Sequence, residues 1–572
     1  MKYFIFVLAI VSSLYAKSYK TLEFKGKGID FLAGDFATST LYKVIGKVYP
    51  PFYTPWRSDP TFDSDEIEDY KQRLKDYLES LGYYKAKIDI KEKKDKIVVY
   101  INRGKRIKVD SIKVYPDSKY KKLILFKEGS AFTTQNFSQS KKRIKRYMLE
   151  NAHPTYKFNA KAYVDLKKYR VDLDFLVDEN KTLYFGKSKI DGAGDVDEEI
   201  IREAFEFKEG KKYDIREIEK SYDNIYDFGI YDIISFESKL DEINGSKVPI
   251  DLHLKMGDTK FLKGDIGYST NDGLRGSISW VDKNFFGNLK QFEIGLKATQ
   301  KGYQAYNRFY NRRIILPYIN KITFENEIEY NHFRYDTFDE TTLLNRLTFG
   351  KLFYRLEHYF GLLTEYSKIK SKVKDEKDES GNYFINSLFY RVLVDKRDSL
   401  IDAKNGYYIS LYLERSLKSL GSDLNYFKLI TDLRYIKTFK NRWTFATKLR
   451  VGRIDKSVPI FKRFFTGGAN TNRGYEYRDI GAKDSGGVAL GGVSLVDSMF
   501  EFRYRAWRKL WLTLFYDSSL LSLKPNDFSS KFYGSYGFGM RYGTVIGPVR
   551  VDFGFPKDRD GWTFHVSIGQ VF

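Results

Sequence analysis

The sequence contains no cysteine and only five histidines. The absence of cysteine excludes disulfide bonds, thiolate nucleophiles and cysteine-ligated metal sites. The histidines, at positions 153, 253, 332, 358 and 565, share no spacing that suits metal binding. Gly186-Lys187-Ser188 looks like the end of a P-loop, but Lys181 stands where that motif needs its first glycine. We therefore expect no catalytic residues, no cofactor and no metal, and we interpret the protein as a non-enzyme.

Long apolar runs are also scarce, since only residues 3–11 form one, directly after Lys2. A basic start, a short apolar stretch and small residues up to Ala16 are typical of a signal peptide, predicted over residues 1–16. The run is too short for a membrane helix, which needs about 20 apolar residues. The net charge of +23 would otherwise suggest nucleic acid as a partner. For an exported chain this charge favours anionic lipids or acidic proteins instead.

Aromatic residues, in contrast, are abundant, with 46 Tyr and 46 Phe. After residue 259 they follow period-two patterns, so that Trp443, Phe445 and Leu449 share one face while Thr444 and Lys448 share the other. An aromatic apolar face opposite a charged face is typical of a barrel in lipid with a wet lumen. The sheet must close, because lipid offers no hydrogen-bonding partner to an open edge. At roughly 20 residues per strand and connection, residues 260–572 predict an all-β, antiparallel transmembrane barrel of about 16 strands, with 14 and 18 left open.

Before residue 260, helical and extended patterns alternate. Helices are predicted over residues 67–81, with Gly82 as a stop, and over 137–148 and 218–226. The tetrapeptide Phe-Lys-Glu-Gly occurs at 126–129 and at 207–210, each time ahead of one of the latter two helices. The spacing, 207 − 126 = 81 residues, is the size of one small module. We predict three α+β modules, at residues 18–104, 105–180 and 181–259.

Two short motifs of the predicted barrel carry a resemblance to a known family. Arg473-Gly474-Tyr475 resembles the Arg-Gly-Phe/Tyr signature of the sixth extracellular loop in the BamA/TamA superfamily. In that family the loop folds back into the lumen, and its arginine meets the aspartate of a Phe-x-Asp motif. That motif is present here as Phe515-Tyr516-Asp517. The resemblance implies a latch made of Arg473, Gly474, Tyr475, Phe515 and Asp517.

The strand alternation supports this latch independently of the resemblance. It directs Phe515 and Asp517 to the lumen, and it sends Glu501 and Arg503 to the same side as supporting charges. Two further matches to the family are Asp395-Lys396-Arg397-Asp398 followed by Gly406-Tyr407, and the terminal Phe572 preceded by Gly569.

Within the superfamily the resemblance leans to the TamA branch, in which three POTRA modules precede a 16-stranded barrel. It implies an outer-membrane assembly or translocation factor with POTRA modules in the periplasm. The implied partners are a TamB-like protein anchored in the inner membrane, client outer-membrane proteins such as autotransporters, and outer-membrane lipids. The working part would be a weakly paired lateral seam between the first and last strands, with Gly264, Gly267, Gly569, Gln570 and Phe572 as its candidate residues.

Three other functions remain open at this point. A BamA-like insertase shares the same barrel motifs. A two-partner secretion transporter would need two modules and an N-terminal plug helix. An outer-membrane barrel hydrolase would need a nucleophile or carboxylate pair in the lumen, where His565 lies on the appropriate face but no serine can be assigned to it.

Overall fold

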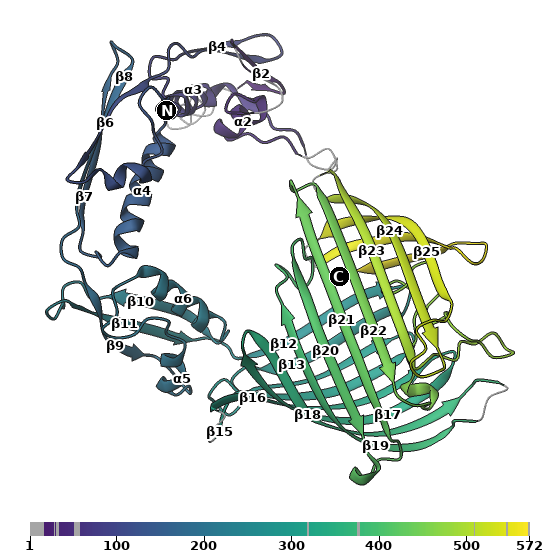
Figure 1. The fold of residues 1–572 in the computed structure, drawn as a ribbon. Coiled ribbons are helices and arrows are strands. Elements are labelled where there is room, and N and C mark those ends of the chain that lie inside the picture. The colour runs from purple at the N-terminus through teal and green to yellow at the C-terminus, as the bar shows by residue number, and fades with distance from the viewer. Residues whose placement is uncertain are drawn as a thin grey trace, which may run out of the picture. The chain divides into compact units, whose positions relative to one another are not determined.

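The computed structural model describes residues 17–27, 29, 34–50, 58–316, 320–374, 378–507, 509–544, 547–569 and 572. The predicted signal peptide and Gln570 lie outside the described residues. The chain divides into two compact units. One contains residues up to 191 together with 203–224 and 234–253, and the other contains 192–202, 225–233 and 254–572. Figure 1 shows small α/β modules in purple to teal and a large barrel that runs from teal to yellow.

The first module packs two helices against a sheet of order β2-β5-β4, in which β2 and β5 run parallel. Helix α3 ends where the sequence predicts, because Gly82 adopts the left-handed φ of +90° that favours glycine. Its buried stripe is Tyr70, Leu74 and Leu78, each four residues after the last. The elements are β1 (Ser18–Tyr19), β2 (Leu22–Lys25), α2 (Thr38–Val44), β3 (Phe62–Asp63), the 3₁₀ turn Ser64–Glu66, α3 (Ile67–Ser80), β4 (Lys87–Glu92) and β5 (Ile97–Asn102).

Two further sheets follow, of order β6-β8-β7 and β10-β11-β9. The repeated tetrapeptide forms the same turn in both. Gly129 and Gly210 each have a φ of +82°, and their N–H groups donate to the first strand of the sheet, at Val109 O and Phe185 O. The elements are β6 (Lys108–Tyr115), the 3₁₀ turn Ser118–Leu123, α4 (Thr134–Glu150), β7 (Lys157–Asp165), β8 (Arg170–Asp178), β9 (Tyr184–Asp191), α5 (Glu198–Glu203), α6 (Ile215–Tyr226), β10 (Tyr231–Ser238) and β11 (Lys247–Met256).

None of the helices in the described part of the chain is long and apolar enough to cross a membrane.

The strands from β12 onward form one closed antiparallel barrel, and its 16 strands confirm the predicted number. β12 starts at Lys260, where the sequence places the start of the barrel. The strands are β12 (Lys260–Ser269), β13 (Gly273–Asp282), β14 (Gln291–Thr299), β15 (Gly302–Leu316), β16 (Asn320–Arg334), β17 (Phe338–Phe353), β18 (Leu356–Ser371), β19 (Gly381–Asp395), β20 (Gly406–Ser416), β21 (Tyr426–Phe439), β22 (Trp443–Ile454), β23 (Ser494–Trp507), β24 (Leu510–Ser522), β25 (Phe532–Thr544), β26 (Gly547–Pro556) and β27 (Thr563–Ile568).

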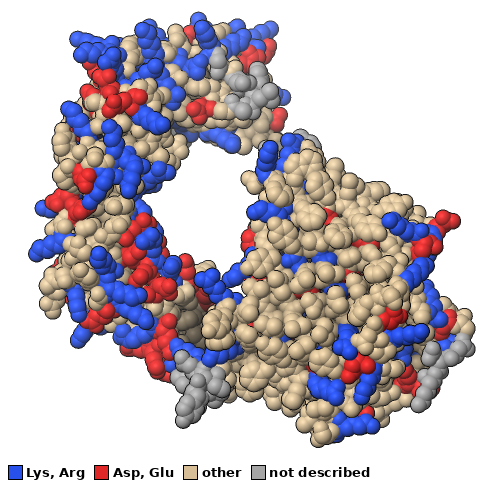
Figure 2. Space-filling model, in the orientation of Figure 1, with Lys and Arg blue, Asp and Glu red and all other residues tan. Residues whose placement is uncertain are grey.

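The two faces of the barrel wall differ as the alternation predicts. On β25, Tyr536, Phe538 and Met540 are exposed on the outside, whereas Arg541 is buried on the inside. Figure 2 shows that much of the visible outer wall lacks charge, while Lys, Arg, Asp and Glu gather toward the ends of the barrel. An apolar outer band with a charged interior is the pattern that a barrel in lipid requires.

Candidate functional site

The segment between β22 and β23, residues 455–493, folds into the barrel lumen, and we call it the lumen loop. It is anchored on one side by Lys462 and Arg463, which pair with Glu365 and Glu379. Short stretches of the loop are fully enclosed, including residues 466–469 and 472–475. A polar loop buried to this extent needs specific partners for its backbone and side chains.

Arg473 is the centre of the loop's contacts, with none of its surface exposed. Its Nε and Nη2 donate to the two carboxylate oxygens of Asp517 at 2.8 and 2.9 Å, and its backbone N–H donates to Asp517 at 3.0 Å. Nη1 donates to Glu501 at 2.5 Å. The guanidinium carbon lies 3.6 Å from the centre of the Phe515 ring. The contact predicted between Arg473 and the Phe-x-Asp motif is therefore present.

The charges around this latch form a balanced network. Glu501 also accepts from Arg503 at 2.6 Å and from Arg541 at 3.0 Å, and Arg541 donates to Asp552 at 2.6 Å. Three arginines thus face three carboxylates, all with 2% exposure or less. Such pairing satisfies buried charges that would be costly alone. The motif search missed Arg541 and Asp552, although the alternation places Arg541 on the lumen face.

The two residues after Arg473 have separate roles. A Cβ on Gly474 would lie 2.3 Å from Ser535 Cβ, so only glycine fits at this close approach. Its N–H donates to Ser535 Oγ at 3.2 Å. Tyr475 is buried, and its hydroxyl donates to Asp558 at 2.5 Å. The latch thus fixes the loop through charge, through backbone fit and through an aromatic anchor.

The junction of β12 with β27 is paired at a single position. Ser269 and Ser567 are its only Cα partners among the described residues, whereas β12 pairs with β13 over its whole length. Two hydrogen bonds lie beside that position: Thr270 N–H donates to Val566 O, and its hydroxyl contacts Nδ1 of His565, both at 3.1 Å. This junction is the predicted lateral seam.

The lumen loop contacts both sides of the seam from within. On the β12 side, Ala469 N–H donates to Asn271 at 3.2 Å. On the β27 side, the Thr563 hydroxyl donates to the carbonyl of Arg473. Arg550 of β26 contacts the loop at Asn470, at 2.9 Å, and also the hydroxyl of Ser567 on β27. Sequence reasoning did not find these contacts, which arise from residues far apart in the chain.

The predicted seam residues do not all lie at the seam. Gly264 and Gly267 are on β12, and Gly569 directly follows β27 with a φ of +99°. Phe572 differs from the prediction. If the Ser269–Ser567 register continued, Phe572 would lie opposite Gly264. Its side chain would then lie on the same face of the strand as Phe564, which points toward lipid.

The ring of Phe572 instead lies inside the barrel with 2% exposure. It packs in a cluster with Ala403, from the connection between β19 and β20, and with Ile436, Ala446 and Met499, from β21, β22 and β23. Arg397 donates to its carbonyl oxygen at 3.3 Å. The physical reason is that burial of the aromatic ring among these side chains removes its apolar surface from solvent.

Comparison with known proteins agrees with this architecture. The family model described as the Omp85 superfamily domain matches residues 256–572. The model of the POTRA family, described as surface antigen variable number repeat, matches residues 33–104 and 105–180. The two matches end at residue 180, and the assignment of residues 181–259 as a third POTRA module stays a prediction.

Two curated relatives are named outer membrane protein assembly factor BamA. The protein from Nitratidesulfovibrio vulgaris is 21% identical, over 78% of this chain and 58% of its own length. The protein from Neorickettsia risticii is 20% identical, over 86% of this chain and 70% of its own length. This chain therefore spans less than two thirds of the first relative. A crystal structure of Haemophilus ducreyi BamA lacking POTRA domains 1–3 is similar in fold, with 16% identity, a TM-score of 0.63, and coverage of 81% of this chain and 99% of that chain.

The chain has a closed 16-stranded barrel with an inward-folded loop, and POTRA modules precede the barrel. These features define the class of outer-membrane barrels that carry POTRA modules. Because the family model covers more than half of the sequence, the chain belongs to the Omp85 superfamily. The barrel lies in the outer membrane and the POTRA modules lie in the periplasm.

Proposed function

We propose that this chain is an outer-membrane assembly factor of the TamA type, which helps insert or secrete outer-membrane proteins, autotransporters among them, or moves lipids. The observation that supports this most is the exposed edge of β12. From Lys260 to Tyr268 this strand has no partner on the β27 side among the described residues. Lipid cannot satisfy the N–H and C=O groups of such an edge. An incoming client strand can, by adding to the sheet.

The length of the strands also favours activity at the seam. β27 has 6 residues, β12 and β26 have 10 each, and β17 and β18 have 16 each. At about 3.3 Å per residue, the wall beside the seam is much shorter than the wall opposite. A short apolar wall matches a thinner bilayer, which locally lowers the barrier to insertion.

The test is a disulfide that locks the seam. Cysteines replace Ser269 and Ser567, which are Cα partners, in a chain that otherwise has no cysteine. The full chain in proteoliposomes should promote folding of an outer-membrane barrel client when reduced and should lose that activity when oxidised. The control is the pair Thr431→Cys and Val451→Cys, Cα partners within the β21–β22 ladder, which should remain active when oxidised. Full activity of the locked seam would contradict the proposal.

For the modules we propose docking of a TamB-like protein anchored in the inner membrane. β7 is an edge strand of the second sheet and pairs only with β8 among the described residues, so it offers an edge for strand addition. Co-purification from intact envelopes tests this. Recovery of a large periplasm-spanning partner, lost when Ala160→Pro blocks the β7 edge, is the expected result, with circular dichroism of the variant to verify that the module still folds.

A BamA-like insertase is the second candidate, and the names of the curated relatives favour it. It shares the seam, so the locked barrel would be inactive in both cases. The TamA-type and BamA-like candidates differ in the partner that co-purifies with the modules. Recovery of a TamB-like protein supports the TamA-type candidate alone. A two-partner secretion transporter predicts instead that deletion of residues 18–104 sharply raises single-channel conductance.

A further inference from the structure

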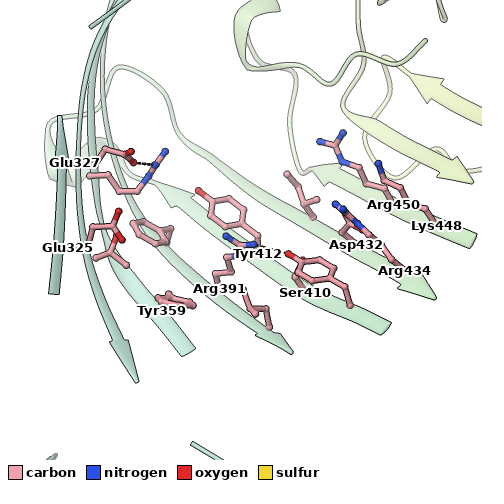
Figure 3. Close-up of a pocket in the computed structure, with 16 residues that line it drawn as sticks. Glu325, Glu327, Tyr359, Arg391, Ser410, Tyr412, Asp432, Arg434, Lys448 and Arg450 are labelled. Carbon is pink, nitrogen blue, oxygen red and sulfur yellow. Dashed lines mark hydrogen bonds and ion pairs between the residues drawn. The ribbon is translucent and has the colours of Figure 1, made fainter. Parts of the chain in front are cut away.

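The half of the lumen nearest the start of β12 contains a cavity of about 800 Å³. Its wall on β21 and β22 carries Arg434, Lys448 and Arg450, and Asp432 is the one carboxylate on that wall among the lining residues. Figure 3 shows these side chains on neighbouring strands, with Glu325 and Glu327 on the far side. The wall therefore has a net charge of 3 − 1 = +2.

The opposite wall does not supply the missing negative charge. Glu327 is already bound by Arg308 at 2.5 Å and by Arg346 at 2.6 Å. Glu325 is bound by Arg308 at 2.9 Å. These acidic groups and their two arginines are balanced among themselves, as the latch network is.

The cations of the β21–β22 wall, in contrast, face one another. Arg434 and Lys448 are direct Cα partners in the ladder, an arrangement of like charges that destabilises a sheet. Asp432 is the Cα partner of Arg450, yet its carboxylate is held by Arg434 at 2.7 and 2.9 Å. The only hydrogen bond of the Lys448 ammonium within the described residues goes to the carbonyl of Asn470, at 3.3 Å.

Arg450 has an aspartate as its Cα partner on each side, Asp432 and Asp497, yet it forms no hydrogen bond or ion pair with either one or with any other residue in the part of the chain that the structure describes. Its other ladder neighbour, Asp497, is hydrogen-bonded to the hydroxyls of Thr466 and Ser519. A half-buried guanidinium with five free donors, beside a second cation, favours a bidentate anion.

We propose that this wall is a binding site for a phosphoryl group, with Arg450 and Lys448 as its direct ligands and Arg434 as a supporting charge. A phosphoryl dianion matches the net charge of +2 and the planar donor fork of arginine. The hydroxyl of Ser410 lines the same cavity and can donate to a further oxygen, whereas the hydroxyl of Tyr412, which also lines it, already donates to Glu414. The cavity is large enough for more than the phosphoryl group alone, so the group can belong to a free phosphate or to a lipid head group.

The experiment is calorimetric titration of the full chain in nonionic detergent, at constant ionic strength, with sodium pyrophosphate. Saturable binding is expected, and Arg450→Gln should weaken it by about tenfold or more, since one charge-assisted bidentate contact is lost. Asp432→Asn should strengthen binding, because it removes the competing carboxylate and frees Arg434. Arg442→Gln removes one positive charge from the turn after β21, outside the cavity, and should leave the affinity unchanged. Heat-modifiable migration in gels verifies that each variant retains a closed barrel.

Soluble dihexanoyl phosphatidic acid is the second titrant. Binding of this lipid that pyrophosphate displaces assigns the site to a lipid head group, and binding of pyrophosphate alone assigns it to a free phosphate. The proposal is overturned if neither binds, or if Arg450→Gln and Arg442→Gln behave alike. Tighter binding of a hexaglutamate peptide than of either phosphoryl probe would also overturn it, in favour of an acidic polypeptide. None of these outcomes depends on the seam, so they test this site separately from the assembly function.

Discussion

Replacing Arg473 with alanine should release the lumen loop, and the size of the effect follows from which carboxylate loses its partners. Glu501 keeps Arg503 and Arg541. Of its partners among the described residues, Asp517 keeps the backbone N–H of residue 473 and loses both guanidinium bonds inside a fully buried site. A buried charge that loses its partner costs about 3–5 kcal/mol. We therefore expect Arg473→Ala to lower the free energy of unfolding by that amount.

The double variant Arg473→Ala with Asp517→Ala should be less unstable than the sum of the single variants, because it removes the stranded charge. Loop release itself is measured with a single cysteine at Ala469, which is fully buried. A membrane-impermeant maleimide should label this cysteine slowly in the parent chain and rapidly with Arg473→Ala. Slow labelling in both, together with a stability change below about 0.5 kcal/mol, would refute the role assigned to the latch.

Three smaller predictions concern other contacts. Gly474→Ala should destabilise the barrel by about 1–3 kcal/mol in denaturant unfolding through overpacking, and Ser535→Gly should restore part of the loss by making room. Phe572→Ala should cost up to about 3 kcal/mol in the same assay because the ring is buried, whereas Phe564→Ala on the lipid face, as the matched control, should cost less. The Arg146 guanidinium holds the pKa of Glu219 below its usual range. This pair, between α4 and α6, therefore stabilises their junction above pH about 4.3, and the stability is lost as the pH falls through the lowered pKa. Glu219→Gln should weaken protection of α6 amides from hydrogen exchange by at most about 1 kcal/mol at pH 7, and the effect should shrink as the pH falls below about 4.

The period-two pattern was sufficient to predict the barrel and the side on which its residues lie. Phe515, Asp517, Glu501 and Arg503 are all buried on the lumen side, as alternation along β23 and β24 requires. A strand's local geometry determines these directions, and they do not depend on distant parts of the chain. The same argument could have added Arg541 and Asp552 to the latch network, since both lie on lumen faces.

Contacts made by irregular segments could not be predicted in this way. The alternation of β27 would place Phe572 toward lipid, but Gly569 leaves the extended conformation and the ring packs against residues from several strands. Ser535 and Thr563 contact the lumen loop because of its path through the barrel, and no periodicity describes that path. The same holds for Arg450, which has no partner among the described residues, because its neighbours across the sheet are known only once the ladder register is known.

The central claim is that clients meet the exposed edge of β12, and site-specific photo-crosslinking tests it most directly. A photoreactive amino acid replaces Ile266, which lies on β12 with 81% exposure, or Leu388, on the lipid face of β19 with 51% exposure. During folding of an outer-membrane client into proteoliposomes, crosslinks to the client should form from position 266 and not from position 388. Equal crosslinking from both positions, or none from 266, would contradict the account.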